Sequence, residues 1–266
     1  MQKVTSKDGT IIAYEQTGKG PVLILVSGAS MDHLSHEPLA EELAAYFTVI
    51  NYDRRGHGES TNTQPYAVER ELEDIDALIS ATGGSACIYG ISSGAALAFE
   101  AAASRPAIKK AALYEPPYSV DHTGDRNPTS DDVKQLKELL SADRRGDAVE
   151  LFFTKLVGIP AGAVAGMKSS PMWSGLEAIA PTFLHDAMIS ATNAGDFSLP
   201  KEQMSSIKIP MLVLDGGASW DWIRATAKAV AEGIPQSEHR TLEGQTHGVD
   251  PKVLTPVLKD FLISKD

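Results

Sequence analysis

The sequence CIYGISSGAALAFE, residues 87–100, connects an apolar run to an alanine-rich run through Gly-Ile-Ser-Ser-Gly. The apolar run has the length of a buried strand, whereas the alanine-rich run favours a helix. A strand that passes into a helix at Gly-x-Ser-x-Gly has to turn sharply, and the two glycines lack the side chains that would collide there. The turn therefore presents its central residue, Ser92, at the carboxyl end of the strand. The backbone N–H of Ser93 points near the same place, at the start of the helix.

The rest of the chain alternates between short apolar runs and longer amphipathic ones. Residues 67–80 and 251–263 place apolar side chains three and four positions apart, which is typical of helices with one buried face. Most of the strand-length runs are almost continuously apolar, as expected for strands covered on both faces. They span residues 10–16, 22–26, 47–52, 86–89, 110–114, 211–214 and 239–242. This alternation predicts an α/β fold with a mostly parallel sheet flanked by helices.

One region, residues 117–200, interrupts the alternation. It contains no convincing strand, but residues 129–140, 147–157 and 181–191 have helical patterns. We expect a helical cap inserted into a core domain formed by residues 1–116 and 201–266. The large apolar side chains of the insertion either roof a pocket for a hydrophobic small molecule or form the insertion's own core. They are Phe152, Phe153, Leu156, Met167, Met172, Trp173 and Phe183.

The composition argues against several classes of partner. The 266 residues carry a net charge of −11 at pH 7, so the surface repels nucleic-acid backbones and anionic lipids. We expect neither nucleic acid nor a membrane as a partner. No segment approaches the roughly 20 apolar residues of a membrane span, and the N-terminus lacks a signal-peptide pattern, which together predict a cytoplasmic location.

The sequence also gives no sign of a prosthetic group. It has no set of metal ligands at a recognisable spacing and no cofactor motif, and its single cysteine, Cys87, cannot form an internal disulfide. We expect a monomer or homodimer whose partner is a small molecule and which uses neither a cofactor nor a metal.

Three motifs, taken together and in this order, resemble the α/β-hydrolase fold superfamily over nearly the whole chain. Residues 53–60, DRRGHGES, are similar to the loop after the strand that precedes the nucleophile strand. Residues 90–94, GISSG, look like the nucleophile elbow, and residues 244–248, GQTHG, resemble the loop with the catalytic histidine. The resemblance implies Ser92 as the nucleophile and His247 as the base.

The carboxylate that would orient His247 departs from the usual arrangement of this superfamily. A serine hydroxyl needs a base, and the base needs a carboxylate to fix its tautomer and stabilise the imidazolium. Most members carry this acid after the penultimate strand, where Ser219 stands here, with Asp221 two residues later. Glu115 instead ends the strand next to the nucleophile strand. Haloalkane dehalogenases and zearalenone-type lactonases have their acid there, after the sixth strand, so we favour Glu115 and keep Asp221 as the alternative.

The resemblance also implies an oxyanion hole built from two backbone N–H groups. One belongs to Ser93, and the other comes from the turn after residues 22–26, where Ala29 follows Gly28. The superfamily usually has His-Gly in this turn, and Ser27 replaces the histidine. Because backbone groups act as the donors, we expect the substitution to leave Ala29 as the second donor.

Two classes of function fit these residues. The first is a serine hydrolase that cleaves a carboxylic ester or lactone of a hydrophobic small molecule through an acyl-enzyme at Ser92; the second is a noncatalytic small-ligand-binding protein on the same fold. The presence of Ser92, His247 and Glu115 together favours the enzyme. A serine nucleophile argues against dehalogenation, whereas perhydrolysis and carbon–carbon bond hydrolysis stay open as alternatives.

Overall fold

The computed structural model describes residues 1–120, 126–191 and 196–264. Within these residues, eight strands form one sheet in the spatial order β1-β2-β4-β3-β5-β6-β7-β8. β2 pairs antiparallel with β1 and with β4, and all other neighbours are parallel. The strands are β1 (Gln2–Thr5), β2 (Ile11–Thr17), β3 (Val22–Val26), β4 (Thr48–Tyr52), β5 (Ala86–Ile91), β6 (Ile108–Tyr114), β7 (Met211–Gly216) and β8 (Ser237–Leu242). The predicted α/β fold class is confirmed.

Hydropathy alone does not predict β1. Its four residues, QKVT, are mostly exposed, so they lack the apolar run that marks the inner strands. A turn brings β1 back against β2: the Asp8 carboxylate accepts a hydrogen bond of 3.0 Å from the N–H of Thr10, and Gly9 has a φ of 87°. An aspartate followed by a glycine is a common turn pair because glycine adopts a positive φ without steric cost.

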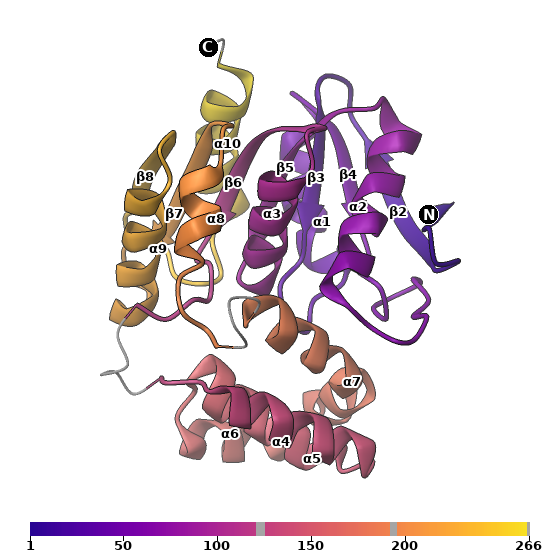
Figure 1. Cartoon of the computed structure of the whole chain (residues 1–266), viewed down its shortest axis with the longest axis vertical. Coiled ribbons are helices and arrows are strands. Elements are labelled where there is room, and N and C mark those ends of the chain that lie inside the picture. The colour runs from indigo at the N-terminus through magenta and orange to yellow at the C-terminus, as the bar shows by residue number, and fades with distance from the viewer. Residues whose placement is uncertain (121–125, 192–195, 265–266) are drawn as a thin grey trace.

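Helices cover both faces of the sheet, and the strand residues alternate between two hydrophobic clusters (Figure 1). Ile24 and Ile88 face the helices α2 (Val68–Thr82), α3 (Ser93–Ser104) and α9 (Asp221–Gly233). Leu25 and Tyr89 face α1 (His33–Leu43) and α10 (Pro251–Ile263) on the other side. Because successive strand residues point to opposite faces, this alternation buries both sides of the inner strands. The short helix α8 (Lys201–Ser206) contacts α3 and α9.

A separate layer of helices lies beyond one end of the sheet (Figure 1). It consists of α4 (Ser130–Ser141), α5 (Arg145–Leu151), a π-helical segment (Phe152–Val157), α6 (Ala161–Lys168) and α7 (Met172–Ser190). The layer has its own hydrophobic cluster, in which the Phe183 ring stacks on Phe152 at 4.5 Å between ring centroids. Most of the large apolar residues expected in the insertion belong to this cluster, whereas Met172 is 58% exposed. The division into a core and a cap domain stays a prediction.

Two helix boundaries in this layer differ from the sequence-based expectation. Residues 147–157 do not form one α-helix, because the chain changes to a π-helical segment at Phe152 and ends at Gly158, which has a φ of 89°. Pro181 does not begin a helix but lies inside α7, where the missing N–H removes one helical hydrogen bond without ending the helix. None of the helices in the described ranges is both long and apolar enough to cross a membrane.

Candidate active site

Ser92 stands at the turn between β5 and α3 in a strained backbone conformation. Its φ of 56° and ψ of −127° lie where a residue with a side chain costs about 1–3 kcal/mol. Its N–H donates to the carbonyl of Tyr114 on β6 at 2.9 Å, which holds the turn in place. A Cβ on Gly90 would lie 2.1 Å from the carbonyl oxygen of Gly94, and one on Gly94 would lie 2.4 Å from that of Val26. The two glycines therefore allow α3 to start this close to the strands.

His247 is held by a buried carboxylate from the end of β6. The Nδ1 atom of His247 lies 2.5 Å from Oε2 of Glu115, whose side chain is fully buried. The other carboxylate oxygen of Glu115 accepts a hydrogen bond of 2.9 Å from the N–H of Gly216 on β7. The hydroxyl of Tyr114 donates to the carbonyl of Thr246 at 2.6 Å and fixes the loop before His247. Because Nδ1 contacts Glu115, Nε2 is the ring nitrogen that remains available for proton transfer.

The structure does not bring Asp221, the alternative acid, to His247. Asp221 is the first residue of α9, its side chain is fully exposed, and its carboxylate lies 4.0 Å from the guanidinium of Arg224. Ser219, at the position where an acid is usual, has a buried hydroxyl with no hydrogen-bond partner among the described residues. Glu115 is thus the carboxylate that reaches the histidine.

The two expected backbone donors line the same pocket as Ser92 and His247. Ser93 is the first residue of α3, so its N–H has no acceptor inside the helix. Ala29 lies in the turn after β3, next to Gly28. A Cβ on Gly28 would lie 3.2 Å from the Cβ of Ser92, so this turn packs directly against Ser92.

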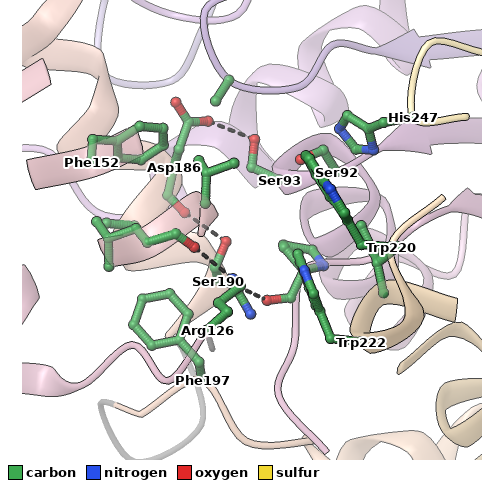
Figure 2. A pocket seen from close by; sticks show the side chains of 16 residues that line it. Ser92, Ser93, Arg126, Phe152, Asp186, Ser190, Phe197, Trp220, Trp222 and His247 are labelled. Carbon is green, nitrogen blue, oxygen red and sulfur yellow. Dashed lines mark hydrogen bonds between the residues drawn. The ribbon is translucent and has the colours of Figure 1, made fainter. Parts of the chain in front are cut away.

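The pocket lies between the sheet and the helical layer (Figure 2). Trp220, Trp222, Ser92 and His247 line it on the side of the sheet, and the Trp220 ring centroid is 6.4 Å from that of His247. The helical layer contributes Phe152, Leu156, Val157, Asp186, Ala187 and Ser190. Of the apolar residues expected to roof a pocket, Phe152 and Leu156 lie in its wall.

A buried charge network behind Ser93 is not evident from the sequence. One oxygen of the Asp186 carboxylate, on α7, accepts hydrogen bonds from the Ser93 hydroxyl at 2.8 Å and from Arg54 at 2.6 Å. Arg54 also binds both carboxylate oxygens of Glu71 at 2.8 Å. Burial alone would raise the pKa of Glu71, but the Arg54 charge outweighs it and lowers this pKa to about 2. The network joins the loop of residues 53–60 to the helical layer.

A second residue that sequence reasoning missed is Arg126. It follows Pro117 by nine positions and lines the pocket together with Ser92. No motif surrounds Arg126, so the sequence offers no signal for it. Arg54, by contrast, lies within the motif of residues 53–60, which is visible in the sequence.

Comparisons with known proteins agree with this fold. The structure matches that of an alpha/beta hydrolase from Sphaerobacter thermophilus with a TM-score of 0.89 and 50% identity, covering 98% of this chain and 100% of that chain. A curated relative, the uncharacterized hydrolase YraK of Bacillus subtilis, is 34% identical over 102 residues, which span 37% of this chain and only 38% of the relative. An esterase from Rhodococcus sp. shares the fold, with a TM-score of 0.68 and 23% identity over 99% of this chain and 98% of that chain.

The family model described as the alpha/beta hydrolase family matches residues 23–251. This range includes all three motifs, the helical layer and the strands that carry the candidate residues. The chain therefore belongs to the alpha/beta hydrolase family.

Proposed function

We propose that the protein is a serine hydrolase that cleaves a carboxylic ester or lactone of a hydrophobic small molecule through an acyl-enzyme at Ser92. The observation that carries the proposal is the 2.5 Å contact between His247 Nδ1 and the buried Glu115 carboxylate, in a site where Ser92 lines the same pocket as His247. The strained turn at Ser92 supports it, because a purely binding protein has no use for a conformation that lowers its stability. A cytoplasmic location and a monomeric or homodimeric state stay predictions.

The proposed reaction uses each of these groups once in acylation and again in deacylation. Nε2 of His247 takes the proton from the Ser92 hydroxyl while Oγ attacks the substrate carbonyl carbon, and Glu115 stabilises the imidazolium that forms. The N–H groups of Ala29 and Ser93 donate to the oxyanion, and each such donor contributes about 3–4 kcal/mol to the transition state. His247 then protonates the alcohol oxygen as the acyl–oxygen bond breaks and the acyl-enzyme forms; the alcohol of an ester departs, whereas that of a lactone stays attached to the acyl group. His247 then deprotonates a water molecule that attacks the acyl carbonyl, and it returns the proton to Ser92 Oγ as the bond between Oγ and the acid breaks.

The named neighbours narrow the reaction type only in part. Solved structures with the same fold include the esterase from Rhodococcus sp. and an enol-lactonase from Burkholderia xenovorans, both under 25% identical to this chain. They support ester or lactone cleavage as the first activity to measure. A solved 2-hydroxy-6-oxo-6-phenylhexa-2,4-dienoate hydrolase from Rhodococcus sp. also shares the fold and is 17% identical to this chain. Its reaction therefore belongs in the same substrate panel.

A fluorophosphonate probe tests the nucleophile directly. We expect it to label the purified protein once, at Ser92, and we expect labelling to fall sharply in His247→Ala, which lacks the base. Ser93→Ala is the matched control: it removes a neighbouring hydroxyl but keeps the backbone donor, so labelling and hydrolysis of 4-nitrophenyl butyrate should stay within about tenfold of the wild type. Ser92→Ala should abolish both. Folded protein that is neither labelled nor active on esters and lactones, but binds small apolar ligands, would favour the noncatalytic alternative.

A further inference from the structure

Arg126 places a buried positive charge in the wall of the pocket. Its relative exposure is 6%, and its three nitrogen atoms donate to neutral oxygens. Nε donates to the carbonyl of Leu156 at 2.7 Å, Nη2 to the carbonyl of Pro117 at 2.9 Å, and Nη1 to the hydroxyl of Ser119 at 3.3 Å. A guanidinium has five N–H groups, so these contacts leave two of them unused.

Two other buried arginines, Arg54 and Arg55, have carboxylate partners, whereas Arg126 has none among the described residues. Arg54 binds the carboxylates of Glu71 and Asp186, and Arg55 binds those of Asp8 and Asp74, at distances between 2.6 and 2.9 Å. No carboxylate in residues 1–120, 126–191 or 196–264 forms an ion pair with Arg126. Burial accordingly lowers the pKa of Arg126 to about 9, whereas the pKa of Arg54 is raised by its carboxylate partners. A buried charge without a counter-charge is unfavourable, so an anion bound beside it would be stabilised.

The surroundings fix the guanidinium in one orientation. Its central carbon lies 4.2 Å from the centroid of the Trp222 ring, and the aromatic face restricts it to a plane. A Cβ on Gly158 would lie 3.1 Å from the Cβ of Arg126, so the glycine at the end of the π-helical segment leaves room for the arginine stem. Figure 2 shows Arg126 beside Phe197 and Trp222, across the pocket from His247. A fork held this rigidly suits a planar, bidentate partner, and a carboxylate has that geometry.

We propose that Arg126 binds a carboxylate of the substrate, so that the preferred ester or lactone carries a second, free carboxylate at a fixed distance from the scissile carbonyl. This inference rests on the proposed function, because it takes Ser92 as the site of attack. It narrows the substrate class from hydrophobic esters in general to anionic ones with an apolar spacer. The aromatic rings of Trp222 and Phe152 would pack against the spacer, while the carboxylate supplies a counter-charge to the guanidinium.

A matched pair of substrates tests the inference. The first is the mono-4-nitrophenyl ester of a dicarboxylic acid, and the second is the same ester with its distal carboxylate capped by a methyl group. Chain lengths from adipate to suberate vary the distance between the carbonyl and the carboxylate. At the best length we expect kcat/KM of the wild type to favour the anionic ester by about tenfold or more, a typical effect of one charge-assisted contact. The preference should appear mainly in KM.

Two variants isolate the contribution of Arg126. Arg126→Met should abolish the preference, so that kcat/KM becomes similar for the anionic and the capped ester within one preparation; Arg126→Lys should keep part of the preference. Lys155→Met is the matched control, because it removes an exposed positive charge from the π-helical segment outside this pocket, and it should keep the full preference. Since the readout is a ratio within one preparation, a partly unfolded variant does not distort it.

A binding measurement separates the two proposals. Calorimetric titration of Ser92→Ala with monomethyl adipate and dimethyl adipate requires no turnover, and the monoester should bind more tightly only when Arg126 is present. Equal kcat/KM for anionic and capped esters at every length, with no change in Arg126→Met, would overturn the carboxylate site and leave the hydrolase intact. Folded protein without labelling at Ser92 or hydrolysis of any ester would instead refute the proposed function. The calorimetry would then still decide whether Arg126 binds carboxylates.

Discussion

The Nδ1 atom of His247 lies 2.5 Å from Oε2 of Glu115, a carboxylate buried at the end of β6 and anchored by the N–H of Gly216 on the next strand. Glu115 and Ser92 follow adjacent parallel strands, β6 and β5, and the two residues are 23 positions apart in the chain. Because the sheet fixes the spacing of these strands, the carboxylate is positioned by the sheet rather than by a long loop.

Glu115→Gln should lower kcat by about 100-fold to 10,000-fold, because the amide keeps the shape of the side chain but cannot stabilise the imidazolium or hold the same tautomer. KM and the melting temperature should change little, since the N–H of Gly216 can still donate to the amide oxygen of the glutamine. Steady-state kinetics with a 4-nitrophenyl ester and a thermal melt measure these quantities. Asp221→Asn is the control and should change kcat less than about twofold. A larger loss in Asp221→Asn than in Glu115→Gln would contradict the assignment of the acid.

The sequence alone predicts those parts of the site that lie within one short segment with a recognisable pattern. The strand, the glycines and the alanine-rich helix around Ser92 lie within one short segment, so their pattern predicts the turn directly. The choice between Glu115 and Asp221 could not be made in this way, because both follow a strand. The orientation of α9, which turns Asp221 towards solvent, depends on packing against the sheet.

Asp186 and Arg126 show why the remaining residues were not predictable. Asp186 reaches Arg54 over 132 positions of sequence, and its carboxylate lies next to Ser93 only because α7 packs against α3. Arg126 is held by carbonyls and an aromatic ring, which leave no pattern in the residue types. Such contacts arise from tertiary packing between distant segments. The residue types along the chain form no periodic pattern from which they could be predicted.

The backbone strain at Ser92 makes a prediction that does not depend on the substrate. A φ of 56° with a ψ of −127° is unfavourable for alanine but is accessible to glycine. We therefore expect Ser92→Gly to be more stable than Ser92→Ala by about 1 kcal/mol, measured as the free energy of unfolding in urea. The same pair of substitutions at Ser104, the last residue of α3, is the control and should give the opposite order, because glycine weakens helices. Equal stabilities for the two Ser92 variants would argue against a strained turn.

Asp186→Ala should destabilise the fold by about 2 kcal/mol. The substitution removes one of the two carboxylates that compensate the buried Arg54 and leaves the Ser93 hydroxyl without its acceptor. Glu71 remains as a partner of Arg54, so the loss should be smaller than that of breaking an isolated buried pair. Glu238→Ala removes an exposed partner of Arg240 and should change stability by less than about 0.5 kcal/mol. Chemical unfolding measures both variants, and similar small effects would show that the network contributes little.

His185, which lies beside the buried network of Arg54, Glu71 and Asp186, should lower the stability of the protein at acidic pH. Burial lowers the pKa of His185 from 6.5 to about 4, so the folded protein keeps this ring neutral while the unfolded chain begins to protonate it near pH 6.5. The unfolded state then binds more protons, and the contribution of His185 to stability is present above pH 6.5 and is lost as the pH falls towards 4. A shift of this size corresponds to about 3 kcal/mol. Glu71, with its pKa lowered to about 2, extends the loss below pH 4.5, because protonation removes its charge beside Arg54.

His185→Phe isolates the histidine part of this acid sensitivity. The imidazole stacks on the Tyr66 ring at 3.8 Å, and its Nδ1 has no hydrogen-bond partner among the described residues, so a phenyl ring preserves the stacking without a titrating group. Between pH 6.5 and 4, the free energy of unfolding of the variant should fall by about 3 kcal/mol less than that of the wild type, whatever their absolute stabilities at pH 7. Below pH 4 the two curves should run in parallel, since Glu71 titrates in both. Parallel curves over the whole range would show that His185 does not remain neutral in the folded protein.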